Sequence, residues 1–374
     1  MAGMNTPQNW FSRPAARAWV GPGQRDDARP FHEALPGYRV TPLVELPVLG
    51  AELSVGRVLV KDESSRLDLP AFKILGASWG SARVVAARTG APLDLAALRT
   101  AAADCGLRLV TATDGNHGRA VAHMASLLGV AATVFVPAAM TEQSAASIRA
   151  EGAEVVRTGS DYDDAVRHAA AFADEDDARE LVQDTAWDGY EQVPAWIVEG
   201  YETLLDELDE ALAGAPDLVA VPVGVGSLAQ AVVTHYRRPG SRHTSVLSVE
   251  PETAACVLAS LRSGALTSVE TGVTNMAGLN CGTPSGAAWP VLLAGCDAAV
   301  AVTDEVAALA VTDLARHGVS SGPSGAATLA GVRAALTGPG SEPRRRELGI
   351  DHTSTVVLLN TEGRQELPNT GDRA

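Results

Sequence analysis

The stretch KDESSRLDLPAFKILGAS, residues 61–78, begins at the end of a predicted strand and runs through a polar loop into a predicted helix. Lys73 lies between the apolar Phe72 and Ile74, and Lys61 is the only other lysine of the chain. Burial lowers the pKa of a lysine, which makes its amine available as a nucleophile for a Schiff base. A lysine that extends from a helix end over apolar neighbours is equally compatible with this stretch. The rest of the chain has to decide between the two.

The composition is that of a globular protein, and it argues against several classes of partner. With 374 residues, 46% of them hydrophobic and 20% charged, the chain can bury a large core. A net charge of −16 argues against nucleic acid or an anionic membrane as a partner. The sequence has neither an apolar run of about 18 residues that would cross a membrane nor the apolar core of a signal peptide. We therefore expect a cytoplasmic protein that acts on a small molecule.

Cysteines and histidines give no indication of a metal site. No two cysteines have the spacing of a CxxC zinc or redox motif, and the histidines do not form an HExxH frame. We expect no bound metal and reduced thiols, as in most cytosolic proteins. Spacing alone leaves a pairing of Cys256 with Cys281 open.

The order of apolar runs predicts the fold class. After an irregular N-terminal arm over residues 1–35, short apolar runs alternate with alanine-rich helical stretches. Most runs are continuous, which is typical of parallel strands covered on both faces and indicates an α/β architecture. Residues 213–216, Ala-Gly-Ala-Pro, predict a hinge or subdomain boundary. The expected strands, besides an entry strand within 38–49, are 58–60, 108–112, 132–136, 154–157, 181–184, 218–222, 244–249, 298–302 and 355–360, and the expected helices include 119–128, 141–151, 162–173 and 195–212.

A second informative stretch is TATDGNHGR, residues 111–119, which follows a predicted strand and opens a predicted helix. Glycines in such a turn expose backbone N–H groups to an anion, such as a carboxylate or a phosphate. Asp114 and Asn116 can act at the same edge, although both residue types are also common helix N-caps. Because a cap would account for only one residue of the set, we favour a binding site here.

A third stretch, VPVGVGSLA at residues 221–229, also leads from a strand through glycines into a helix. In one interpretation, the amides of Gly224 to Leu228 wrap a single phosphate. In the other, the stretch is a relaxed GxGxxA dinucleotide pattern, with Glu250 as the acid that binds the ribose. The second interpretation accounts for neither Lys73 nor the turn at Asp114. A Walker loop is excluded because no GK[ST] follows.

Two polar residues lie where predicted strands end. Asp184, in QDTAW at 183–187, is at the edge where the sites of α/β proteins usually gather, although a solvated loop acid would look the same. Thr361 follows the last predicted strand and could simply cap a turn.

Taken together, these segments resemble the pyridoxal-phosphate (PLP) enzymes of the tryptophan-synthase β fold, also called fold type II, and within them the diaminopropionate ammonia-lyases. Asp114 is characteristic of that subgroup, because the serine and threonine dehydratases of this fold carry serine at this position. The resemblance covers about residues 36–365. Its strongest parts are 61–76, 111–119, 183–201, 224–229 and 276–284.

The resemblance implies an architecture. We expect two open, twisted, mostly parallel sheets covered by helices, with the active site in a cleft between a large and a small domain. The large PLP-binding domain would comprise residues 36–77 and 206–374, and the smaller α/β domain residues 78–205. Enzymes of this fold are usually homodimers, and we expect one here.

The resemblance also implies roles for single residues. Lys73 would carry PLP and move the Cα proton of the substrate, with Asp114 as the base opposite it. Asp114 and Asp184 would attract a second ammonium group and transfer protons. The substrate carboxylate would be held by Thr113, Asp114, Gly115 and His117. The other cofactor contacts would be Phe72, Asn116 at the ring hydroxyl, Thr361 at the pyridine nitrogen, and Gly224, Val225, Gly226, Ser227 and Leu228 at the phosphate.

The implied reaction is β-elimination of 2,3-diaminopropionate, as the D or L isomer or both, to pyruvate and ammonia through aminoacrylate. Two departures from the family pattern put the substrate in question. Pro323 stands where the subgroup has glutamate in Ser-Gly-Glu-Ser-Gly, and Arg364-Gln365 replaces an acidic segment. The alternatives are therefore β-elimination or β-replacement on a related amino acid, as in serine and threonine dehydratases. An NAD-dependent oxidoreductase and a non-enzymatic, regulatory cofactor-binding protein are further hypotheses.

Overall fold

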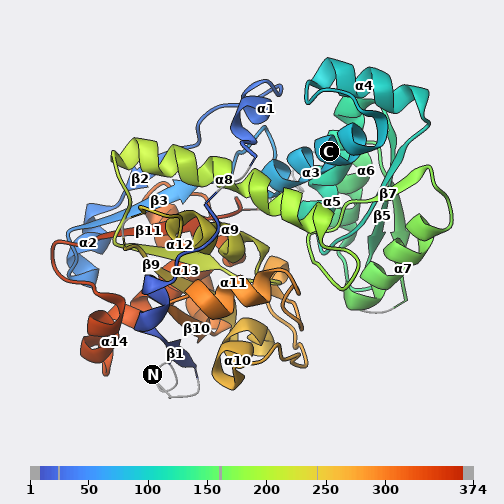
Figure 1. Ribbon diagram of the computed structural model, residues 1–374. Coiled ribbons are helices and arrows are strands. Elements are labelled where there is room, and N and C mark those ends of the chain that lie inside the picture. Colours follow the sequence, from blue (N-terminus) through green and yellow to red (C-terminus); the bar gives the residue numbers. More distant parts are fainter. Residues whose placement is uncertain (1–8, 24–25, 160–161, 242, 365–374) are drawn as a thin grey trace, which may run out of the picture.

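The computed structural model describes residues 9–23, 26–159, 162–241 and 243–364, and it contains two separate β-sheets (Figure 1). The larger has seven strands in the order β1-β10-β9-β8-β11-β3-β2, and the smaller has four in the order β6-β5-β4-β7. This confirms the predicted fold class. Gln365 and the C-terminal residues after it lie outside the described residues.

The large sheet has a parallel centre and antiparallel edges. Its parallel strands are β3 (Arg57–Asp62), β8 (Leu218–Pro222), β9 (Ser245–Pro251), β10 (Ala298–Val302) and β11 (Thr355–Asn360). The edge strands β1 (Trp10–Ser12) and β2 (Leu43–Glu45) run antiparallel to their neighbours. Part of the expected irregular arm is therefore a strand, which three residues are too few to reveal by periodicity.

Helices cover both faces of the large sheet. Val219 and Val221 of β8 belong to the core cluster that includes α9, whereas Leu218 and Ala220 belong to the cluster that includes α13. Burial on both faces explains the continuous apolar runs in the sequence. The helices of this part are α2 (Pro47–Leu53), α9 (Ser227–Tyr236), α10 (Cys256–Ser263), α11 (Ala288–Gly295), α12 (Asp304–Arg316), α13 (Pro323–Leu336) and α14 (Ser341–Leu348), with short helices η1 (Pro14–Ala18), α1 (Arg29–Glu33), η2 (Glu252–Ala254) and η3 (Ala277–Leu279).

The small sheet is entirely parallel. Its strands are β4 (Arg108–Ala112), β5 (Ala131–Val136), β6 (Glu154–Arg157) and β7 (Arg179–Leu181), and its helices are α4 (Leu95–Asp104), α5 (Asn116–Leu128), α6 (Glu142–Ala150) and α7 (Tyr162–Asp174). All four strands fall within residues 78–205, and the domain boundaries themselves stay a prediction.

The strand expected over residues 181–184 has the wrong bounds, because β7 begins at Arg179 and already stops at Leu181. Val182 still donates its N–H to Val110, at 2.8 Å. The next acceptor for β4 is a side chain: Gln183 Oε1 accepts the N–H of Ala112, at 2.9 Å. The main chain is thereby free to turn away, and Asp184 lies in the following loop.

Two long helices, α3 (Lys73–Thr89) and α8 (Gln192–Leu212), connect the two sheets (Figure 1). They pack closely because small residues lie at their crossing. A Cβ atom at Gly76 would be 2.5 Å from the Tyr201 ring, and one at Gly200 would meet the carbonyl of Leu75. Residues 213–216, expected as a hinge or subdomain boundary, form the short connection from α8 to β8, and their role as a hinge stays a prediction.

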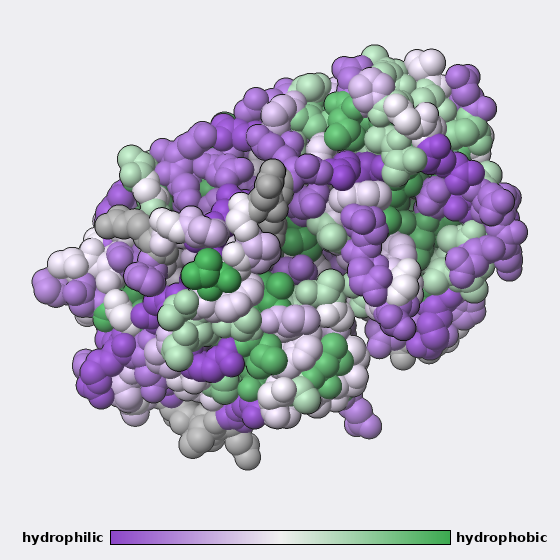
Figure 2. Space-filling model, in the orientation of Figure 1, coloured by the Kyte–Doolittle hydropathy of each residue, from purple (hydrophilic) through white to green (hydrophobic). Residues whose placement is uncertain are grey.

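The surface agrees with a charged globular protein. Hydrophilic and hydrophobic residues alternate over the face in Figure 2, without one continuous apolar area. Within the ranges that the structure describes, no helix is long and apolar enough to cross a membrane.

Candidate active site

One cavity brings the three sequence motifs together at the carboxyl ends of β4, β8 and β11, the edge where α/β proteins place ligands. It is lined by every residue that the sequence predicted for the site, namely Phe72, Lys73, Thr113, Asp114, Gly115, Asn116, His117, Asp184, Gly224, Val225, Gly226, Ser227, Leu228 and Thr361. The role of each residue stays a prediction.

Lys73 is the first residue of α3, and its amine forms an ion pair with the carboxylate of Asp184. The Nζ atom lies 5.3 Å from the centre of the Phe72 ring and 6.0 Å from that of Tyr201. Burial alone would lower the pKa of Lys73, but the negative charge of Asp184 raises it above its ordinary value. The expected lowered pKa is therefore wrong, because the compensating carboxylate comes from a segment 111 residues away.

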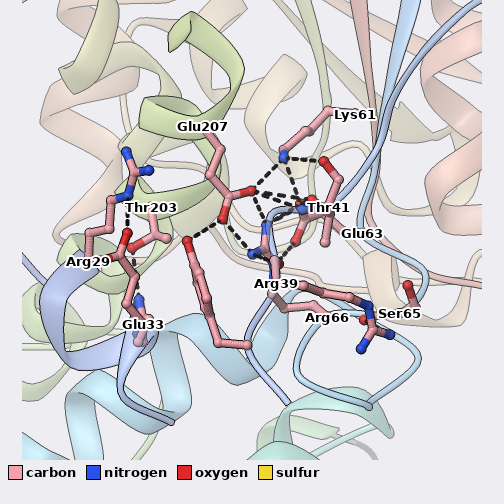
Figure 3. Close-up of polar contacts among 12 residues, drawn as sticks. Arg29, Glu33, Arg39, Thr41, Lys61, Glu63, Ser65, Arg66, Thr203 and Glu207 are labelled. Atoms are coloured by element: carbon pink, nitrogen blue, oxygen red, sulfur yellow. Dashed lines mark hydrogen bonds and ion pairs between the residues drawn. The ribbon is translucent and has the colours of Figure 1, made fainter. Parts of the chain in front are cut away.

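The other lysine does not line the cavity. Lys61 is buried in an ionic cluster with Glu63, Arg66 and Glu207, in which two cations face two carboxylates (Figure 3). The carboxylate of Glu207 on α8 lies 2.6 Å from Lys61 Nζ and 2.7 Å from Arg66 Nη1. The carboxylate of Glu63 lies 2.7 Å from Arg66 Nε. Of the two lysines, only Lys73 is therefore available to a ligand in the cavity.

Asp184 is ionised although it is buried. Burial opposes its ionisation, but His117 and Lys73 bring its pKa down to about 2. His117 Nε2 lies 2.8 Å from the carbonyl oxygen of Val182, so this nitrogen carries the ring hydrogen. The other nitrogen, Nδ1, is 3.8 Å from Asp184 Oδ2 and has no hydrogen-bond partner among the described residues. Burial also lowers the pKa of His117, whereas the negative charge of Asp184 opposes this shift.

Asp114 is the opposite case. Burial, with the charges of Asp184 and Asp163, raises its pKa to about 7. The capping interpretation of this residue is wrong, because α5 begins after Gly115 with no side-chain cap bond. Thr113 serves the turn instead: its Oγ1 accepts the N–H of Gly115 at 2.8 Å and that of Gly118 at 3.0 Å. The Asp114 carboxyl is thus left to the cavity.

The glycine-rich loop after β8 presents backbone amides to the cavity. α9 begins at Ser227, and the amides of a helix's first turn have no acceptor within the helix. Gly226 has φ of +98°, a conformation that favours glycine. The Ser227 hydroxyl donates to the carbonyl of Asp184 at 2.6 Å, which ties the loop to the acid. An anionic group fits this loop.

Glu250 does not reach this loop, so the dinucleotide interpretation is wrong. Its carboxylate accepts the N–H groups of Val257 and Leu258 at the start of α10, each at 2.7 Å. Both oxygens of this carboxylate therefore cap the start of α10, and neither is available to bind a ribose.

A profile of the family described as "Pyridoxal-phosphate dependent enzyme" matches residues 34–359. The chain belongs to this family. It is 34% identical over 350 residues to the diaminopropionate ammonia-lyase of Escherichia coli strain K12, which covers 90% of this chain and 87% of the relative. It is 35% identical over 381 residues to the enzyme of the same name from Salmonella typhimurium, covering 96% and 94%. A solved structure of the Escherichia coli enzyme in complex with an aminoacrylate-PLP azomethine reaction intermediate superimposes with a TM-score of 0.80, at 32% identity, over 97% of this chain and 91% of that one.

The cavity suits the cofactor of this PLP family. It has one lysine, Lys73, and a helix start whose amides can receive a phosphate. The hydroxyl group of Ser324 also lies in its wall, beside the carboxyl group of Glu362. Together these residues would hold PLP by its aldehyde carbon, its phosphate and its ring.

The departures at Pro323 and Arg364 lie outside this PLP site. Among the described residues that line the cavity, neither occurs. Pro323 is the first residue of α13, where a missing N–H leaves no helical bond unmade. Arg364 is exposed and donates its N–H to Ser320. These two departures therefore give no structural reason to prefer an alternative substrate.

Sequence reasoning missed part of the cavity wall. Glu362 follows Thr361 directly and could have been included with it, whereas nothing in the sequence around Tyr162 distinguishes that residue. The further lining residues are Ala112, Tyr162, Pro222, Ala277, Gly278, Leu279, Cys281, Ser324 and Glu362.

All four cysteines are free thiols, so Cys256 and Cys281 are not paired.

Proposed function

We propose that this PLP-family enzyme eliminates ammonia from 2,3-diaminopropionate, as the D or L isomer or both, and so forms pyruvate and ammonia through aminoacrylate. The observation that carries the proposal is the pair of carboxyl groups beside Lys73, with pKa values of about 2 at Asp184 and about 7 at Asp114. Two carboxyl groups in opposite protonation states can divide base and acid roles at neutral pH. The names of the relatives support the same substrate.

Bound PLP would supply the electron sink for negative charge at the substrate's Cα. The protein would do the rest. Lys73 would take the Cα proton from one face and Asp114 from the other. When the bond from Cβ to nitrogen breaks, the nitrogen keeps the electron pair: an ammonium group leaves directly as ammonia, and a neutral amino group leaves as ammonia by taking the proton of Asp114. Ammonia leaves, and released aminoacrylate takes up water to yield pyruvate and a second ammonia.

Substrate selection would rest on charge. Ionised Asp184, with Asp114 near it, would attract the second ammonium group of diaminopropionate. Serine carries a hydroxyl there and would leave the acidic pair without a cation. We infer that the turn at residues 113–117 holds the substrate carboxylate, that Asn116 meets the ring hydroxyl and that Thr361 meets the ring nitrogen. The amides of residues 224–228 would hold the phosphate, and Phe72 would border the cofactor.

The test is to incubate the PLP-loaded enzyme with D- and L-diaminopropionate, serine and threonine, and to measure pyruvate or oxobutyrate. We expect rapid pyruvate formation from at least one diaminopropionate isomer and little from serine. Borohydride reduction followed by peptide mass spectrometry should find the cofactor on Lys73. Absence of pyruvate from both diaminopropionate isomers would refute the proposed substrate.

We further propose that the enzyme is a cytoplasmic homodimer. Its free thiols suit a reducing compartment, and the dimer follows from the resemblance to fold type II enzymes. Light scattering coupled to size-exclusion chromatography would give the mass of the particle, and a mass of one chain would contradict the dimer.

A further inference from the structure

Glu362 lies in the cavity wall with its carboxyl group between two hydrogen-bond donors. Its Oε2 accepts from the side-chain amide of Asn116, at 2.8 Å, and its Oε1 accepts the backbone N–H of Ser324, at 3.1 Å. Asn116 is the first residue of α5 beside the small sheet, and Ser324 lies in the first turn of α13 against the large sheet. One carboxyl group therefore links the two parts of the molecule across the cavity.

The backbone around Glu362 is paired with the segment that carries Lys73. Ala71 and Glu362 form an antiparallel bridge. Phe72 donates its N–H to the carbonyl of Thr361 at 3.1 Å, and Gly363 donates to Pro70 at 2.9 Å. The position of Glu362 is thus fixed relative to Lys73 before its side chain makes any contact.

The turn before α13 is shaped to receive this carboxyl group. Gly322 donates its N–H to the carbonyl of Glu362 at 3.0 Å, and a Cβ atom at Gly322 would lie 2.5 Å from Glu362 Oε1. Pro323 gives the turn no carboxylate of its own. Burial raises the pKa of Glu362, whereas hydrogen bonds from Ser324 and Asn116 favour the ionised form.

We propose that Glu362 is a positioning residue that orients Asn116 toward the cofactor ring. A carboxylate accepts hydrogen bonds only, so it draws the NH₂ group of Asn116 and not its carbonyl. One hydrogen of that NH₂ group is taken by Glu362, and the other is left for the ring hydroxyl. The inference rests on the proposed contact of Asn116 with that hydroxyl, but it does not depend on the substrate.

The variant Glu362→Gln tests this orientation with little change of shape. An amide at this position has one acceptor for two donors, so either Ser324 or Asn116 loses its partner or Asn116 turns round. We expect about ten-fold weaker PLP binding, from fluorescence titration of the apoenzyme. We also expect a shift in the pH at which the absorbance of bound PLP changes.

The matched control is Glu151→Gln. Glu151 also accepts from two side chains of α5, Arg119 and His123, each at 2.9 Å, but it does not line the cavity. We expect this variant to bind PLP with the parent's affinity and spectrum. If Glu362→Gln behaves like the parent, or if both variants lose the same affinity, the proposal is overturned.

Two more variants separate positioning from a general loss of structure. Gly322→Ala displaces the carboxyl group without changing its charge, and it should also weaken PLP binding and shift the same absorbance transition. In an Asn116→Ala background, Glu362→Gln should change PLP affinity less than two-fold, since the group it orients is gone. An unaffected Gly322→Ala variant, or a full additional loss in the Asn116→Ala background, would overturn the role. A failure of diaminopropionate turnover would leave these binding results untouched.

Discussion

Lys73 and Asp184 show how one contact changes the chemistry of a residue. Apolar neighbours alone would favour a neutral amine, but the ion pair keeps Lys73 protonated until PLP or substrate competes for it. Asp184 is held ionised by the same contact, while Asp114 has no cation paired with it among the described contacts and stays partly protonated near neutral pH. The site thus holds an acid and a base of the same residue type.

For this pair of carboxyl groups we predict the effect of Asp114→Asn. With the isomer whose Cα proton Lys73 takes, protonated Asp114 is the acid for the leaving amino group, so the parent's rate should fall as pH rises through about 7. The asparagine variant cannot donate in this way, so its rate should be lower by about 10²-fold or more and should lack that limb. Steady-state kinetics between pH 5 and pH 9 give both quantities. PLP affinity serves as the control, since we expect it to stay near the parent's, and an unchanged pH profile would contradict the role.

Among the elements, the loop between β3 and α3 depends on buried charges. Its residue Arg66 and the strand residue Lys61 are both neutralised by Glu207 of α8, so α8 holds the loop that leads to Lys73 (Figure 3). Burial opposes the ionisation of Glu207, but Arg66 and Lys61 lower its pKa to about 2. The stability that this residue contributes is therefore complete above the ordinary pKa of glutamate and is lost as pH falls through about 2.

For this cluster we predict the effect of Glu207→Ala. It would leave Lys61 and Arg66 with one carboxylate between them in a dry environment, and should lower the free energy of unfolding by about 3–5 kcal/mol. The control is Glu210→Ala on the same helix, which removes an exposed pair with Arg29 and should leave the free energy of unfolding close to the parent's. Urea unfolding at pH 7 measures both. Equal, small losses would show that the buried cluster is not needed for stability.

For the whole molecule, the crossing of α3 and α8 sets how the two sheets meet around the cavity. The helices approach closely at Gly76, Gly80 and Gly200, and α3 starts at Lys73. A shift at the crossing would therefore move the lysine relative to the loop after β8. Protein cores transmit such shifts because they are densely packed.

This arrangement predicts the result of Gly200→Ala. The new methyl group would meet the backbone carbonyl of Leu75, which cannot rotate away, so we expect a loss of about 1–3 kcal/mol in unfolding free energy. We also expect weaker PLP binding, because Lys73 moves with α3. Gly159→Ala is the control, since no heavy atom of the described residues, its chain neighbours aside, lies within 4 Å of its added Cβ atom. Unfolding curves and PLP titration report the two effects, and parent-like values for Gly200→Ala would exclude the crossing as a constraint.

The sequence by itself determined the α/β class, the placement of most strands and the three loops of the site. Strands buried on both faces must be continuously apolar, and turns that expose amides need glycine, so both leave local patterns. The strands at 108–112, 218–222 and 298–302 were predicted with the bounds that the structure has.

Only the tertiary structure decided the pKa values of the site residues and the groups that their side chains contact. The raised pKa of Lys73 comes from Asp184, Glu250 serves α10 and not a nucleotide, and the carboxyl group at the start of α13 comes from Glu362. Each of these depends on residues that are separated in the sequence and close together in the folded chain. Electrostatic interactions weaken with distance and strengthen with burial, and both are properties of the folded chain.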